Sequence, residues 1–176
     1  YTAEGTEDVS FIVPITETTK LPADKIAQDA TAPDDAFFAG YYNGSVKAVA
    51  DLVLTEDTVF AARFLTKDSF AGAWVSAEQN ISMTIGATGA TGTIAGSFKF
   101  DAATGKLKIG SVETWTLTLS DDLLSVAVDH YYDQYGDGYA EDFIHEYYTL
   151  TKHNLTGLEG KYVLRDNDQL LINEVG

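Results

Sequence analysis

Apolar and polar residues alternate along most of this chain, which is the pattern of strands that bury one face. Residues 114–119, for example, place Trp115, Leu117 and Leu119 on one side and threonines on the other. No segment shows a sustained helical period of apolar residues. The pattern therefore predicts an all-β protein. The same alternation occurs in residues 58–64, 70–74, 81–85, 94–100, 107–109, 124–128, 144–150, 161–165 and 169–175.

Short turn sequences separate these predicted strands. Residues 102–105 end in a glycine, Asp121 and Asp122 follow the strand that contains Trp115, and residues 166–168 separate the last two strands. About 10–12 strands that follow one another through such turns predict an antiparallel meander. We expect an up-and-down β-barrel, because closure removes exposed strand edges. A β-sandwich is the alternative.

Two segments in the middle of the chain carry more specific expectations. Residues 38–54 alternate throughout and predict one long strand, bent at Gly44 because a glycine inside a strand marks a bulge or a sharp bend. The glycine- and threonine-rich residues 86–92 predict a flexible loop without a strand.

The N-terminal part of the chain has a different pattern. Residues 7–15 predict a strand, and Pro14 restricts it to an edge or ends it. Residues 16–35 are polar and weakly patterned. We therefore divide the chain into an N-terminal strand with a weakly structured linker, residues 1–36, and a single antiparallel β domain, residues 37–176. The strand at 7–15 is expected to pair within its own chain; the alternative is self-association by β-augmentation of a neighbour.

Two triplets resemble a known signature. Gly40-Tyr41-Tyr42 opens the main β region, and Gly72-Ala73-Trp74 lies in mid-chain. They are similar to the glycine-x-tryptophan signature of lipocalin-like barrels, whose other motifs are missing here. The resemblance covers the barrel-like part of the chain and implies an up-and-down barrel.

Composition excludes several classes of function. The chain has 27 acidic and 11 basic side chains and a net charge of −16, so phosphate backbones and anionic membrane surfaces would repel it. We expect no nucleic-acid partner, and no apolar run is long enough to predict a membrane span. With no cysteine, the chain has neither disulfides nor thiolate metal sites.

Several features favour export from the cell. The sequence starts at Tyr1 without a methionine, as a processed mature terminus or a trimmed sequence would. Three asparagines, Asn43, Asn80 and Asn154, have the N-glycosylation acceptor pattern, although chance matches are common in a threonine-rich chain. We expect an extracellular, cell-surface or periplasmic location.

Residues 129–148 are the most distinctive stretch, with six of the ten tyrosines, two of the three histidines and six carboxylates. Tyrosine presents a large apolar face and a hydroxyl at little entropic cost, which suits binding of glycans, peptides or flat small molecules. Part of this set is also expected to pack as ordinary strand aromatics. The candidate ligand-binding residues are Tyr131, Tyr132, Tyr135, Tyr139 and Tyr147.

The same stretch could hold calcium. It half matches an EF-hand loop that begins at Asp133, because Gly138 takes the sixth position while Tyr135 and Ile144 stand where ligands are needed. A looser Ca²⁺ site is the alternative, and a simple hairpin turn around Asp-Gly is the interpretation we favour. The looser site would use Asp129, Asp133, Asp137 and Glu141.

Catalytic signals are weak. If Tyr132 pairs with Tyr139, His130 lies opposite Glu141, but neither a third zinc ligand nor a nucleophile motif accompanies that pair. This favours a non-enzymatic role. We expect a secreted or cell-surface binding module for a small molecule, glycan or protein partner, with no cofactor unless Ca²⁺ binds. The alternative is a structural subunit of an extracellular assembly or filament that uses the N-terminal strand.

Overall fold

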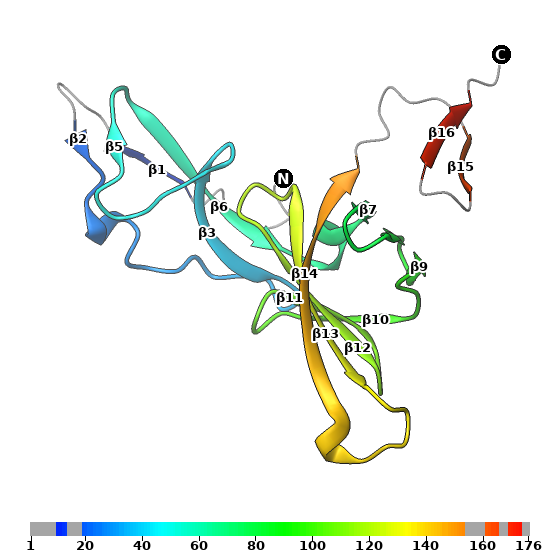
Figure 1. Cartoon of the computed structure of the whole chain (residues 1–176). Coiled ribbons are helices and arrows are strands. Elements are labelled where there is room, and N and C mark those ends of the chain that lie inside the picture. Colours follow the sequence, from blue (N-terminus) through cyan, green and yellow to red (C-terminus); the bar gives the residue numbers. More distant parts are fainter. Residues whose placement is uncertain (1–9, 14–18, 154–160, 166–168, 174–176) are drawn as a thin grey trace.

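The protein is all-β in the computed structural model, which describes residues 10–13, 19–153, 161–165 and 169–173. Figure 1 shows the two larger antiparallel sheets, a nearly closed barrel and a smaller N-terminal sheet, and two further sheets have two strands each. The helices of the described residues are single 3-10 turns, and none could cross a membrane. The predicted all-β class is confirmed.

Eight strands form the barrel sheet, in the order β10-β11-β12-β13-β14-β7-β8-β9. Neighbours in this sheet are also neighbours in sequence, except where β14 pairs with β7 from Thr151↔Val75 to His153↔Ala73. Near the two ends of the order, Ala90 of β9 and Gly96, which precedes β10, form an isolated bridge with N–H···O distances of 2.8 and 2.9 Å. The predicted meander barrel is therefore confirmed as a nearly closed sheet. Its strands are β7 (Gly72–Ser76), β8 (Ile81–Ile85), β9 (Ala90–Gly92), β10 (Phe98–Asp101), β11 (Lys106–Gly110), β12 (Thr114–Leu119), β13 (Ser125–Asp133) and β14 (Phe143–His153).

The inward-facing residues of these strands make one packed core. Trp74 is completely buried, and its indole N–H donates to the carbonyl of Phe70 at 2.8 Å, so burial leaves no unpaired donor. An eight-stranded barrel can be filled by its own side chains or can hold one small ligand; here buried side chains occupy the interior. The core residues are Phe70, Trp74, Met83, Ile85, Ala90, Ile94, Leu107, Ile109, Leu117, Val126, Val128 and Leu150.

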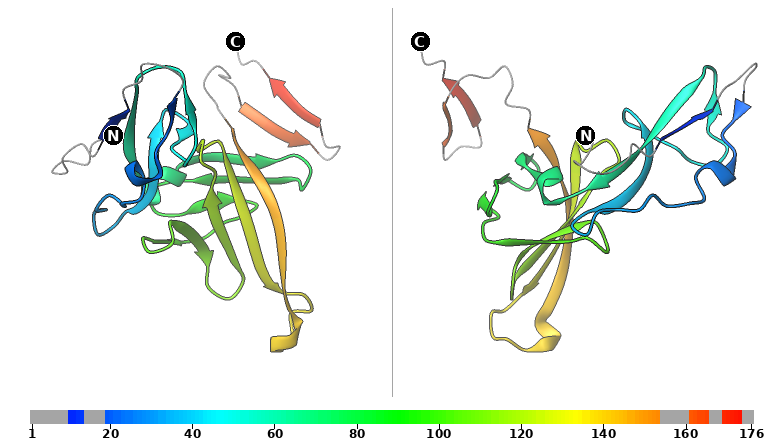
Figure 2. Two further views of the ribbon diagram at one scale, coloured as in Figure 1. Left: turned by 90° about the vertical axis from the view of Figure 1, so that its left-hand side faces the viewer. Right: turned by 180° about the vertical axis from the view of Figure 1, so that it is seen from behind.

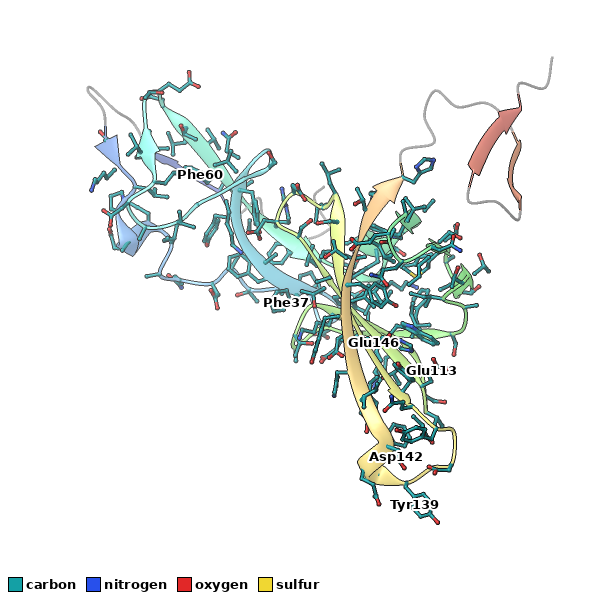
Figure 3. All side chains as sticks on the ribbon, in the orientation of Figure 1. Phe37, Phe60, Glu113, Tyr139, Asp142 and Glu146 are labelled. Carbon is teal, nitrogen blue, oxygen red and sulfur yellow. The ribbon has the colours of Figure 1, made fainter. Side chains whose placement is uncertain are left out.

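The N-terminal sheet has its own core, centred on Phe60, which Figure 3 labels. Its strand order is β1-β6-β3-β4, and β1 pairs with β6 of the same chain from Ser10↔Ala61 to Val13↔Thr58. Strands from both sides of residue 36 therefore share this sheet. We call this part of the chain the N-terminal lobe and the barrel the second lobe. The N-terminal lobe contains β1 (Ser10–Val13), β2 (Thr19–Lys20), η1 (Ala23–Lys25), β3 (Phe37–Asn43), β4 (Val46–Lys47), β5 (Val53–Leu54) and β6 (Thr58–Leu65); η2 (Lys67–Phe70) leads to the barrel.

Two local expectations are wrong. The chain does not continue as one strand through residues 38–54 but reverses at Gly44, so that Asn43 pairs with Val46. Gly44 has a φ of +57°, which glycine adopts without steric cost and which tight hairpins require. Residues 86–92 are not only a loop, because β9 begins at Ala90 and pairs with β8. The predicted C-terminal hairpin is confirmed as β15 (Lys161–Arg165) with β16 (Gln169–Asn173).

A polar cluster joins the two lobes. Asp121, in the β12–β13 turn, accepts hydrogen bonds from the Tyr42 hydroxyl at 2.6 Å and from Lys47 Nζ at 3.0 Å. Arg63 donates to the carbonyl oxygens of Asp121 and Gly44, and its guanidinium lies 3.6 Å from the centre of the Tyr42 ring. The hydrogen bonds from Tyr42 and then Lys47 hold the pKa of Asp121 below its usual value. Figure 2 shows both lobes from two further sides.

Candidate ligand-binding surface

The β13–β14 hairpin extends beyond the barrel at one end, as Figures 1 and 2 show. The two strands pair continuously from Ser125↔Thr151 to Asp133↔Phe143. The strands on either side cover only part of the hairpin. β12 pairs with β13 as far as Tyr131, and β7 pairs with β14 only from Thr151 to His153. Among the described residues, no further strand lies beside the edges of the outer part of the hairpin.

The loop at the tip is organised by Asp133. Its Oδ1 accepts the backbone N–H groups of Tyr135 and Gly136 at 3.1 and 2.8 Å, and its Oδ2 accepts that of Gly138 at 2.6 Å. These bonds, the one from Gly138 foremost, lower the pKa of Asp133. A 3-10 turn, η3 (Ala140–Asp142), returns the chain to β14.

The four predicted calcium ligands do not converge in this structure. Asp133 is bonded to its own loop, Asp137 accepts the N–H of Tyr139 at 3.2 Å, and Asp129 is bonded to a histidine on β14. Nowhere in residues 10–13 and 19–153 do three histidine or acidic side chains gather closely enough to hold one ion. A calcium site at this loop remains a prediction that requires the loop to rearrange.

The predicted partner of His130 is wrong. Tyr132 pairs with Ile144 rather than with Tyr139, so His130 lies opposite Glu146. The reason is the length of the loop, since the predicted short turn is replaced by residues 134–142.

One face of the hairpin, which continues the inner face of the barrel, carries a stack of three rings. His130 lies between Trp115 and Tyr132, with ring centroids 4.8 and 4.4 Å away and interplanar angles of 10° and 19°. The stack brings together residues from β12 and β13, which pair as Trp115↔His130. We call it the inner stack.

Two glutamates flank the inner stack, and Figure 3 labels both of them. Glu113 Oε1 lies 2.7 Å from His130 Nε2, and Glu146 Oε2 lies 3.7 Å from His130 Nδ1. The Tyr132 hydroxyl donates to Glu146 at 2.8 Å, which raises the pKa of Tyr132. Nearby, burial raises the pKa of Tyr148 to about 12. Polar contacts with Glu113 and Glu146 thus hold the rings of His130 and Tyr132 in the inner stack.

The opposite face carries a second row of rings, which we call the outer stack. Tyr131 lies between Phe143 and His145, at centroid distances of 5.1 and 4.8 Å. His145 is nearly parallel to Tyr147, at 5.9 Å and 7°. Asp129 Oδ1 lies 2.6 Å from His145 Nδ1, which fixes the histidine ring. The outer stack therefore presents Tyr147 in a set orientation, with 73% of that residue exposed.

A shallow groove of about 400 Å³ adjoins the outer stack on the outer face of the barrel. Asp129 and Tyr147 belong to both features. Threonine hydroxyls and a lysine provide further hydrogen-bonding groups. The groove is lined by Lys106, Thr116, Thr118, Ala127, Val128, Asp129, Tyr147, Tyr148 and Thr149.

The structure distributes the five predicted tyrosines over three places. Tyr131 and Tyr147 belong to the outer stack and Tyr132 to the inner stack, while Tyr135 and Tyr139 lie at the exposed tip. Sequence reasoning missed four partners of these rings, namely Glu113, Trp115, His145 and Glu146. With the correct length of the β13–β14 loop, the pairing of the two strands would have placed Glu146 opposite His130.

The predicted glycosylation sites are exposed where they are described. Asn43 and Asn80 are both at the surface, and Asn43 Nδ2 donates to the carbonyl of Val59 at 3.0 Å. Asn154 lies outside the described residues.

Comparisons with protein-family models, with curated proteins and with solved structures give no match for this chain. The chemistry of the site is therefore inferred from its own residues.

Proposed function

We propose that this protein is a binding module that holds a glycan in the groove beside the outer stack. The observation that carries the proposal is the exposed ring of Tyr147, held parallel to His145 at the margin of the groove. Sugar rings have apolar C–H faces that pack on aromatic rings, and Tyr147 offers such a ring at little ordering cost because His145 already orients it.

The lining of the groove is mostly apolar, as the C–H face of a sugar ring requires, and the polar groups within it fit the hydroxyl groups of such a ligand. Thr116, Thr118 and Thr149 can each donate or accept a hydrogen bond, and Asp129 keeps a second oxygen beside the one bonded to His145. Lys106 adds a donor. A neutral glycan suits this set better than a polyanion, because the chain as a whole has a net charge of −16.

Glycan-array screening of the intact protein, followed by calorimetric titration with the selected glycan, tests the proposal. Replacing Tyr147 by alanine should weaken binding roughly tenfold, because packing one ring contributes about 1.5 kcal/mol or more. Tyr135→Ala is the matched control, since Tyr135 is equally exposed but lies at the tip, away from the groove. Equal affinities of the Tyr147→Ala variant and the parent protein would refute the proposal.

We further propose that the protein acts outside the cytoplasm, at the cell surface, in the medium or in the periplasm. The strong negative charge and the exposed acceptor asparagines at 43 and 80 support this location. Fractionation of the source cells with an antibody against the protein tests it, and recovery in the cytoplasm alone would contradict it.

The second candidate function is a subunit of an extracellular assembly. It is favoured by β1, which among the described residues is an edge strand paired with β6 alone and in which exposed Ile12 lies opposite exposed Val59. Exchange of β1 between copies would build a chain of subunits. Light scattering after size-exclusion chromatography tests this function. A monomer at every concentration would exclude it, whereas polymers that disappear on deletion of residues 1–16 would support it.

A further inference from the structure

The outer half of β14 is an open strand edge. On the side away from β13, β7 pairs with β14 only from Thr151 to His153. Within the part of the chain that the structure describes, no strand pairs with that side over residues 143–150. Figure 2 shows this length of β14 at the margin of the hairpin.

The ladder fixes which backbone groups face the open edge. Lys152 N–H donates to the carbonyl of Leu124, and Gln134 N–H donates to that of Asp142, so even-numbered residues of β14 bond toward β13. In an antiparallel sheet the alternate residues turn their N–H and C=O groups the other way. Those residues are Phe143, His145, Tyr147 and Thr149, consistent with Thr151 facing β7.

The sequence of this edge has little of the usual protection against pairing. Natural edge strands carry charged side chains, proline, bulges or short lengths that discourage added strands, and here the only carboxylate in residues 143–149 is Glu146, which would repel an acidic strand but not a basic one. Residues 143–149 contain no lysine, proline or glycine, and their ladder with β13 is unbroken. Aromatic rings flank the edge on both faces, with Tyr147 and Tyr148 adjacent in sequence.

We propose that this edge of β14 binds an extended, basic peptide by β-augmentation. Residues 129–148 contain six carboxylates and no lysine or arginine, so the whole hairpin complements a cationic strand. Glu146 lies in the middle of the edge, and its side chain is 54% exposed. A second copy of this chain fits less well, because it would bring the same carboxylates together against a net charge of −16.

The side chains of the added strand would contact those of β14 on both faces of the sheet. Its cationic side chains on the inner face would lie beside Glu146, where opposite charges across a pair of strands attract. Its side chains on the outer face would lie beside Tyr147 and His145, whose rings accept arginine or lysine stems. This interaction goes beyond the proposed glycan site and does not depend on it.

A short synthetic peptide of alternating lysine and threonine tests the inference. We expect it to bind the intact protein in fluorescence anisotropy and to slow amide hydrogen exchange at His145 and Tyr147. The N–H groups of Ile144 and Glu146, already bonded to β13, should change little. Glu146→Gln should weaken binding by about two- to fivefold, the size of one cross-strand charge pair.

Two N-methylated peptides provide the control without altering the protein. Methyl groups on every second amide block one edge of the peptide, so one of the two alternating sets should abolish binding and the other should leave it intact. Equal binding by both sets, or no protection at His145 and Tyr147, would overturn the inference. Protection of these amides without peptide, together with a dimer in light scattering, would also overturn it and identify a second copy as the occupant.

Discussion

Tyr42→Phe is the substitution that tests the polar cluster between the lobes. It removes the hydroxyl that donates to Asp121 at 2.6 Å but keeps the ring that lies 3.6 Å from the Arg63 guanidinium. A hydrogen bond to a charged group contributes roughly 1.5–3 kcal/mol. The Asp121 side chain is 60% exposed, so solvent screening reduces the expected loss to about 1 kcal/mol. For a chain of this length that corresponds to a fall in Tm of about 2–4 °C.

The pH dependence of the same variant gives a sharper assay. Because the folded pKa of Asp121 is lowered, the carboxylate stabilises the fold above its unfolded pKa, and this contribution is lost as the pH falls through the folded pKa. Calorimetric melting curves of parent and variant should therefore differ at neutral pH and converge in acid. Tyr41→Phe, whose hydroxyl bonds to Gln28 O instead, should show no such convergence. A Tyr42→Phe difference that persists unchanged in acid would refute the role of Asp121.

Three further predictions follow from the barrel and the hairpin tip. Trp74→Ala should destabilise the protein by about 3–5 kcal/mol in denaturant titration, because it empties the barrel core, whereas Tyr139→Ala at the exposed tip should have no measurable effect. The tip should lose its order as the pH falls through the lowered pKa of Asp133, since protonation weakens the bonds from Gly136 and Gly138. A fall in the protection factors of those two amides, relative to their intrinsic exchange at each pH, would show it, and unchanged protection factors would contradict it. If the loop binds calcium, millimolar Ca²⁺ should raise the Tm relative to EDTA, and identical melting curves would exclude the site.

The periodicity of the sequence predicted the barrel because each strand buries one face. Leu117, Val126 and Leu150 are all at inward positions, as two-residue alternation requires. The limits of the method are equally physical. At Gly44 the alternation in the sequence continues through a complete reversal of the chain, although the two-residue turn pairs Asn43 with Val46 and so places the even-numbered positions before and after it on opposite faces. The signal that could have shown the reversal was Gly44-Ser45, because glycine followed by serine is a common two-residue hairpin loop.

The sequence predicted which region holds the candidate site but not how the side chains of that region are paired. Tyrosine and carboxylate content identified residues 129–148, yet the partner of each side chain depends on the loop length, which composition does not set. An error of several residues in that length exchanged Glu141 for Glu146 opposite His130. The stack of Trp115 on His130 also required the register between β12 and β13, which depends on the whole barrel.

The most direct test of the central claim is to map bound glycan on the protein by NMR, using the glycan selected on the array. The proposed function predicts that backbone and side-chain resonances of Thr116, Tyr147 and Thr149 shift together with the same dissociation constant. Resonances of Tyr135 at the tip should remain unchanged. Shifts confined to the tip, or to the N-terminal lobe around Phe60, would contradict a binding surface beside the outer stack.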